Sequence, residues 1–183
     1  EDAALLLQVI AGADGRDNTA SSRPVDDYPV QSQQQGRYTV GYLQEALDSP
    51  GLDPEIRQAT QQTLGQLKAA GHTVKAVHFP LLDHVVPCYY VLTTAEASSN
   101  LSRYDGIRYG FRHPEAQDLE SVYTRSRTEG FGTEVKRRII MGTFVLSAGY
   151  FDAYYAQAMK VRRLIREKTL ALLQEVDLLL MPT

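Results

Sequence analysis

The order of apolar and polar positions predicts a strand, a helix and a second strand in the first half of the chain. Residues 38–43 and 73–79 are rich in β-branched and aromatic side chains, which is typical of strands, and Pro80 ends the second one. Residues 53–70 repeat apolar side chains at helical spacing, and Asp53 is placed to cap the helix. Two successive strands joined by a helix form a parallel pair, so this order predicts an α/β fold. The stripe expected to face the core consists of Ile56, Ala59, Thr63, Leu67 and Ala70.

The remainder of the chain is predicted to be mainly helical. Residues 85–102 are mostly apolar or small, which indicates a buried helix. Residues 13–38 are rich in Asp, Ser, Gln and Pro and are expected to form a loop. A final strand is predicted at residues 176–181. The other expected helices lie at residues 1–11, 114–129, 132–150 and 152–174.

Length, charge and cysteine content narrow the class of protein. The 183 residues fit one domain, and the net charge of -3 gives no reason to expect a polyanionic partner. The one cysteine, Cys88, cannot form an internal disulfide, and a free thiol suits a reducing compartment, so a cytoplasmic location is expected. No apolar run approaches the ~20 residues that span a bilayer, so no membrane partner is expected.

Both ends of the sequence indicate a chain cut from a longer one. The first helix begins directly after Glu1, and the last strand ends close to Thr183. A terminal strand leaves unpaired backbone groups unless another segment covers it. Residues 1–183 are therefore interpreted as a single piece of a larger domain. The alternative is a processed boundary with nothing missing.

Few residues fall into a pattern that predicts catalysis. The four histidines lack metal-ligand spacing, and neither a phosphate-binding loop nor a Gly-x-Ser-x-Gly elbow occurs, so no metal site is predicted. Cys88 lies in an apolar helix, where burial is favoured over nucleophilic work. Ser98 and Ser99 fall inside the same helix and are interpreted as packing residues. Glu96 has apolar neighbours in the sequence, so its carboxylate is expected to need a hydrogen-bonding partner. It is interpreted either as part of a structural salt bridge or as a pocket residue.

Arginines and aromatic residues alternate directly after this helix. Such mixing occurs in segments that bind nucleic acids. The chain is acidic overall, however, and Asp105 and Glu115 lie nearby. Stacking and ion pairing within a protein explain the pattern as well, so both interpretations stand. The residues concerned are Arg103, Arg108 and Arg112, with Tyr104, Tyr109 and Phe111.

Arg138 occupies the most informative charged position. Helical spacing places it on one face with Met141, Gly142 and Val145, so a guanidinium is expected on an apolar surface. Such a charge is costly unless it is paired. An internal carboxylate would satisfy it, and so would the carboxylate of a ligand held by two parallel hydrogen bonds. The residue pattern supports an internal carboxylate and a ligand carboxylate equally well.

Several long segments resemble the amidase signature family, and in particular the glutaminase (A) subunits of the glutamyl-tRNA(Gln)/aspartyl-tRNA(Asn) amidotransferases. Residues 95–110, which begin Ala-Glu-Ala-Ser-Ser-Asn, are similar to the central segment of these subunits. The resemblance covers essentially the whole chain, and its two ends are common to the wider family. The other similar segments are residues 1–7, 127–132, 135–139, 142–147, 149–155 and 180–183.

This resemblance implies a fold, an activity and a set of partners. The fold is a mixed sheet covered by helices on both sides, of which this chain is an internal-to-C-terminal part. Family members hydrolyse the side-chain amide of glutamine and pass the ammonia to a B subunit. That subunit uses ATP and Mg²⁺ to amidate mischarged tRNA, giving Gln-tRNA(Gln), Asn-tRNA(Asn) or both, and a small C subunit joins the two. No cofactor is expected on this chain itself.

The catalytic residues implied by the resemblance are two serines and a lysine in a glycine- and serine-rich segment. No such segment occurs in this chain, so the triad is expected upstream of Glu1, and the chain alone is expected to be inactive. Arg138 matches the arginine that binds the substrate carboxylate, and Tyr89 matches a tyrosine at the pocket edge. These two are the predicted substrate-binding residues. The alternatives are a fragment of another amidase-signature amidohydrolase and a catalytically inert interaction piece.

Overall fold

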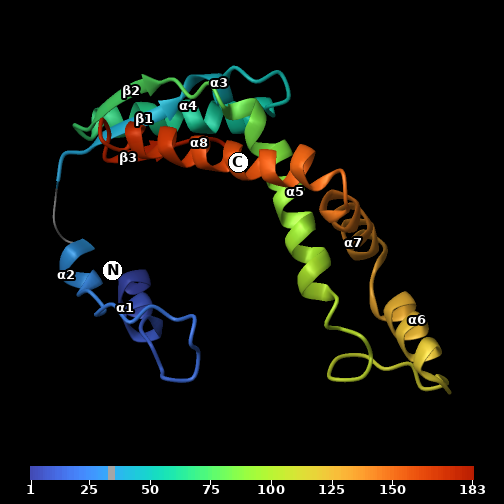
Figure 1. Ribbon diagram of the computed structural model, residues 1–183. Helices are drawn as coiled ribbons and strands as arrows, with labels where there is room; N and C mark the ends of the chain where they lie inside the picture. Colours follow the sequence, from blue (N-terminus) through green and yellow to red (C-terminus); the bar gives the residue numbers. More distant parts are fainter. Residues whose placement is uncertain (33–35) are drawn as a thin grey trace.

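A three-stranded parallel sheet and the helices around it form the structure, a computed structural model that describes residues 1–32 and 36–183 (Figure 1). The strand order is β2-β1-β3, and both pairs run parallel, so the predicted α/β class is confirmed. In register, Val40 of the central strand lies opposite Val74 on one side and Leu178 on the other. The strands are β1 (Thr39–Leu43), β2 (Thr73–Val77) and β3 (Leu178–Leu180).

Helix α4 (Pro54–Ala69) forms the predicted crossover between β1 and β2. Its N-terminus is capped as expected, because the Asp53 carboxylate accepts the backbone N–H of Glu55 at 2.8 Å. The predicted buried face was wrong. The buried residues are Thr60 and Leu64, whereas the members of the expected stripe are exposed or half-buried. Thr60 tolerates burial because its hydroxyl donates to a backbone carbonyl of the preceding turn at 2.8 Å.

The hydrophobic core lies between the sheet and helix α8 (Gln157–Leu172). Chain reversal after α8 brings β3 alongside β1, and Figure 1 shows α8 running next to the strands. Gly41 in the middle of β1 leaves room for this core, since a Cβ there would lie 3.1 Å from side chains on both sides. The buried members of the cluster are Leu43, Val77, Phe79, Leu172 and Val176.

Helices α5 (Leu82–Leu101) and α7 (Thr133–Leu146) make the most extensive helix contact in the described part of the chain. Gly142 permits it, because a Cβ there would lie 1.9 Å from the carbonyl oxygen of Thr94. Beside this point the hydroxyls of Ser98 and Thr143 are 3.0 Å apart, which confirms the packing role expected for Ser98. Helix α5 begins three residues before the predicted start, and most of its surface is not buried.

Three further boundaries differ from the predictions. Helix α6 (Leu119–Gly130) begins five residues late, because Asp118 forms a capping box with Ser121. Helix α7 ends before its predicted end, where the Ser147 hydroxyl bonds to a carbonyl of the last turn at 2.7 Å. The helix expected at residues 152–174 opens with a π-helical turn, η1 (Phe151–Ala156), before α8.

The first part of the chain forms helices α1 (Asp2–Ile10) and α2 (Tyr28–Ser32), and β1 is followed by the short helix α3 (Gln44–Leu47). Helices α1 and α2 contact each other and lie apart from the sheet (Figure 1). Helix α2 corrects the loop expected at residues 13–38, because the Asp27 carboxylate accepts the backbone N–H of Val30. Residues 33–35 of that expected loop lie outside the described residues.

The described structure is open and exposes much apolar surface. Its accessible surface is 13401 Å², whereas a compact protein of 20.4 kDa has about 8,800 Å². Helix α1 contains no buried residue, and Ile140 on α7 is 70% exposed. Over the described ranges, no helix combines the length and apolar character needed to cross a membrane.

Candidate functional site

The two predicted substrate-binding residues come together across the contact between α5 and α7. Arg138 lies on α7 and Tyr89 on α5, where Tyr89 is half exposed. Hydrogen bonding by the Tyr89 side chain, and then by the Glu134 carboxylate, raises the pKa of the Arg138 guanidinium above its ordinary value. The close approach at Gly142, one helical turn beyond Arg138, fixes the register of the two helices at this point. Arg138 and Tyr89 therefore lie next to each other across the two helices.

An internal carboxylate also contacts Arg138. One oxygen of Glu134 accepts the Nε–H of Arg138 at 3.1 Å, and its other oxygen accepts from Arg137 at 3.3 Å. The Arg138 side chain remains about one third exposed. Arg138 was predicted to share an apolar face of α7 with Met141, Gly142 and Val145, and of these three residues Gly142 and Val145 are buried. A guanidinium bonded through Nε keeps its terminal nitrogens for a second carboxylate, so this geometry suits recognition of a carboxylate ligand.

A hollow of about 540 Å³ adjoins Tyr89 between α5, η1 and α8. Its wall is largely apolar, and Glu96 and Arg162 supply opposite charges. Glu96 is exposed rather than enclosed by apolar neighbours, and its carboxylate accepts from the Asn100 amide at 3.4 Å. The salt bridge considered for Glu96 is thus replaced by a weak hydrogen bond along the helix. The remaining lining residues are Val85, Leu92, Thr93, Tyr155 and Met159.

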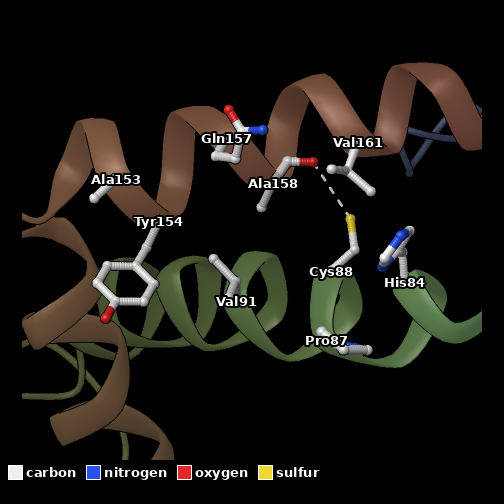
Figure 2. Close-up of a pocket in the computed structure, with 9 residues that line it drawn as sticks. All are labelled: His84, Pro87, Cys88, Val91, Ala153, Tyr154, Gln157, Ala158 and Val161. Carbon is white, nitrogen blue, oxygen red and sulfur yellow. Dashed lines mark hydrogen bonds between the residues drawn. The ribbon is translucent and has the colours of Figure 1, made fainter.

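Cys88 lies in the interface between α5 and α8, as Figure 2 shows. Its thiol is buried and donates to the carbonyl oxygen of Ala158 at 3.3 Å. Burial raises the pKa of the Cys88 thiol, with a smaller opposing effect from Arg162. Because a nucleophilic cysteine needs a lowered pKa and access, this geometry confirms the interpretation of Cys88 as a packing residue.

The arginine- and tyrosine-rich segment after α5 folds into a loop that α6 holds in place. The Arg127 side chain donates to the carbonyl oxygens of Leu101 and Tyr104 at 2.9 and 3.1 Å. The rings of Tyr104 and Tyr109 meet edge to face at a centroid distance of 5.1 Å. Internal stacking thus accounts for part of the aromatic pattern. Contact of this segment with nucleic acid stays a hypothesis that the geometry does not test.

Glu134 was missed by the sequence reasoning, although the sequence contains a signal for it. A glutamate four residues before an arginine on one helix predicts an ion pair, and Glu134 precedes Arg138 by that spacing. Arg162, an exposed residue of α8, lines the hollow beside Tyr89. Within the described residues, no three His, Cys, Asp or Glu side chains are grouped to hold a metal ion.

Comparison with known proteins agrees with this fold. The sequence model of the family described as Amidase matches residues 1–183, so the chain belongs to that family. Among its relatives, a protein of Azotobacter vinelandii and one of Pseudomonas aeruginosa strain LESB58 are each 50% identical over 184 residues. Both are named as the A subunit of glutamyl-tRNA(Gln) amidotransferase. Each alignment covers 100% of this chain but 38% of the relative, so the chain spans well under half of their length.

A solved structure gives the same result for the fold. The crystal structure of the A subunit of glutamyl-tRNA(Gln) amidotransferase from Thermotoga maritima matches with a TM-score of 0.61 and 30% sequence identity. The match covers 96% of this chain and 33% of that one. The three parallel strands and their helices are thus similar to one part of an amidase fold.

Proposed function

We propose that this chain forms part of the glutamine-hydrolysing A subunit of a tRNA-dependent amidotransferase. The observation that carries the proposal is 50% identity, over the full length of this chain, to proteins named as A subunits of glutamyl-tRNA(Gln) amidotransferase. The pairing of Arg138 with Tyr89 across two helices supports it, because glutamine presents an α-carboxylate that a guanidinium recognises. The chain contributes a wall of the glutamine pocket and none of the catalytic triad.

In this role Arg138 binds the α-carboxylate of glutamine by charge-assisted hydrogen bonds. Tyr89 bounds the same site from α5, where its side chain helps to raise the pKa of the Arg138 guanidinium. Binding the α-carboxylate fixes one end of the substrate, so that the side-chain amide reaches a constant position for attack. The nucleophile, a serine assisted by a second serine and a lysine, is supplied by a part of the protein outside these 183 residues.

The residues described belong to a larger amidase domain. The accessible surface of 13401 Å² is about one and a half times that of a compact protein of this mass. The exposed apolar faces are therefore suited to packing against other parts of the same domain. The edge strand β3 supports this, because Leu178 on it is 53% exposed and its outer backbone edge is suited to pairing. The alignment covers 38% of the length of the relative, which agrees with this chain being one part of a larger domain.

The partners follow from the same proposal. Ammonia released from glutamine passes to a B subunit, which uses ATP and Mg²⁺ to activate the mischarged aminoacyl-tRNA, and a C subunit joins the two. The tRNA is reached through the B subunit, and the product is Gln-tRNA(Gln), Asn-tRNA(Asn) or both. A cytoplasmic location suits this reaction, and the free, buried thiol of Cys88 is compatible with a reducing compartment.

The test is an assay of the intact protein that contains this chain. Glutamine hydrolysis is measured alone, with the B and C subunits, and with ATP and mischarged tRNA added. The proposal predicts glutaminase activity that increases when the complete system is present, together with amidated tRNA. Hydrolysis of unrelated amides without any response to the B and C subunits or tRNA would identify another amidase-signature amidohydrolase instead.

A further inference from the structure

The charged residues at the start of α7 form an ordered set around one carboxylate. Glu134 lies in the first turn of the helix, where the aligned backbone N–H groups favour a negative charge. Its two oxygens are divided between two arginines, with Arg138 Nε at 3.1 Å and Arg137 Nη1 at 3.3 Å. Each oxygen therefore limits the movement of one arginine side chain.

The geometry points to Glu134 as a positioning residue that holds Arg138 ready for the α-carboxylate of glutamine. This inference rests on the proposed function, because it needs Arg138 to be the carboxylate-binding residue. A free arginine side chain has many rotamers, and fixing them on binding costs affinity. The bond from Nε to Glu134 fixes the guanidinium before the substrate arrives. It also uses the one nitrogen that a bidentate pair with a substrate carboxylate through the terminal nitrogens does not require.

The charge balance of the set favours an anionic ligand despite the nearby glutamate. Glu134 contributes one negative charge, and Arg137 and Arg138 contribute one positive charge each. The set keeps a net positive charge, so an incoming carboxylate is attracted to it. Tyr89 completes the group from α5 as a side chain that can hydrogen-bond. Glu134 thus orients Arg138 without cancelling its attraction for the substrate.

A purely structural role fits Glu134 less well. Its side chain is 57% exposed, and exposed ion pairs along one helix contribute little to folding stability. A matched pair exists elsewhere in the chain, where Glu167 accepts from Arg163 Nε at 2.7 Å with the same four-residue spacing on α8. Removing Glu167 therefore reproduces the loss of charge and of a helical ion pair away from the candidate site.

The test is a double-mutant cycle in the intact glutaminase protein that contains this chain, with KM and kcat for glutamine measured for each variant. Glu134→Ala is expected to raise KM about ten-fold and to change kcat by less than about two-fold. Glu134→Gln is expected to raise KM less, because its amide oxygen still accepts from Arg138 Nε. The control Glu167→Ala is expected to leave both constants unchanged.

The combined variant separates the possible failures. If Glu134 acts through Arg138, then Glu134→Ala has no further effect on KM once Arg138→Ala is present. Equal loss from Glu134 in both backgrounds overturns the positioning role. If Arg138→Ala raises KM while Glu134→Ala and Glu134→Gln do not, the inference fails and the proposed function stands. If Arg138→Ala leaves KM unchanged, the proposed role of Arg138 fails, and this inference fails with it.

Discussion

Tyr89 and Arg138 are distant in sequence, yet the Tyr89 side chain approaches the Arg138 guanidinium across the contact between α5 and α7 and helps to raise its pKa. The contact depends on helix packing, because Gly142 allows the backbones to approach closely one turn further along α7. A site made from two helices in this way is sensitive both to the side chains themselves and to the distance between the helices. Substitutions at Tyr89 and at Gly142 separate these two dependences.

Removal of the Tyr89 hydroxyl tests the contribution of α5 to the site. Tyr89→Phe keeps the ring and removes the hydroxyl through which Tyr89 acts on the Arg138 guanidinium, so we expect KM for glutamine to rise about five-fold with little change in kcat. Steady-state kinetics of the intact protein measures this. Tyr90→Phe is the control, since Tyr90 is the adjacent and similarly exposed tyrosine of the same helix. Equal effects of the two substitutions would contradict a specific role for Tyr89.

The close approach of α5 and α7 makes Gly142 sensitive to any added side chain. A Cβ at Gly142 would lie 1.9 Å from the backbone oxygen of Thr94, which cannot rotate away, so Gly142→Ala is expected to lower the free energy of unfolding by about 3 kcal/mol. Urea denaturation of the intact protein measures the change. The control is Gly65→Ala in α4, where a Cβ meets nothing within 4 Å. That substitution is expected to stabilise by about 0.5–1 kcal/mol, and similar destabilisation by both would refute the packing argument.

The buried thiol of Cys88 is expected to react slowly with alkylating reagents. Burial raises its pKa, so the folded protein holds less thiolate at a given pH than a free cysteine does. The linked contribution to stability is present below the pKa of the unfolded thiol, about 8.5, and is lost as the pH rises through the higher folded value. Mass spectrometry of the Cys88 peptide after iodoacetamide treatment, with and without urea, measures the protection. Equal rates in both conditions would contradict burial.

The order of strands and helices was predictable from this sequence because the local signals are strong. Asp53 caps α4, as its position before Pro54 indicates, and the second strand lies where it was predicted, although it ends at Val77 rather than directly before Pro80. Helix ends fixed by side-chain hydrogen bonds were harder to predict. Asp118 starts α6 late, and Ser147 ends α7 early, because each bonds to the backbone next to it.

Buried faces were predicted less well than elements, for a physical reason. Thr60 and Thr94 are buried although they are polar, because each hydroxyl donates to the carbonyl four residues earlier. A pattern based on apolar side chains misses such residues. For the candidate site, helical spacing placed Arg138 with the buried Gly142 and Val145, although Met141 is exposed, and only the packing of α5 against α7 brings Tyr89 to it. Contacts between distant segments of this kind have no signal in local spacing.

The chain by itself is expected to hydrolyse no glutamine. Its 183 residues contain no glycine- and serine-rich segment of the kind that holds the two serines and the lysine in the family that it resembles. A glutaminase assay of the isolated chain, followed by ammonia release, measures this directly. Turnover that a serine-directed reagent abolishes would contradict the assignment of the triad to another part of the protein.

Binding of the α-carboxylate of glutamine by Arg138 is tested by comparing two arginine variants. In the intact protein, Arg138→Ala is compared with Arg163→Ala, which removes a helical arginine of similar pairing on α8. Each variant is assayed with glutamine and with a related amide that lacks the α-carboxylate. If Arg138 binds the α-carboxylate, Arg138→Ala is expected to raise KM for glutamine about 100-fold and to change kcat/KM for the second amide by less than about two-fold. An unchanged KM for glutamine, or an equal loss with both substrates, would contradict it.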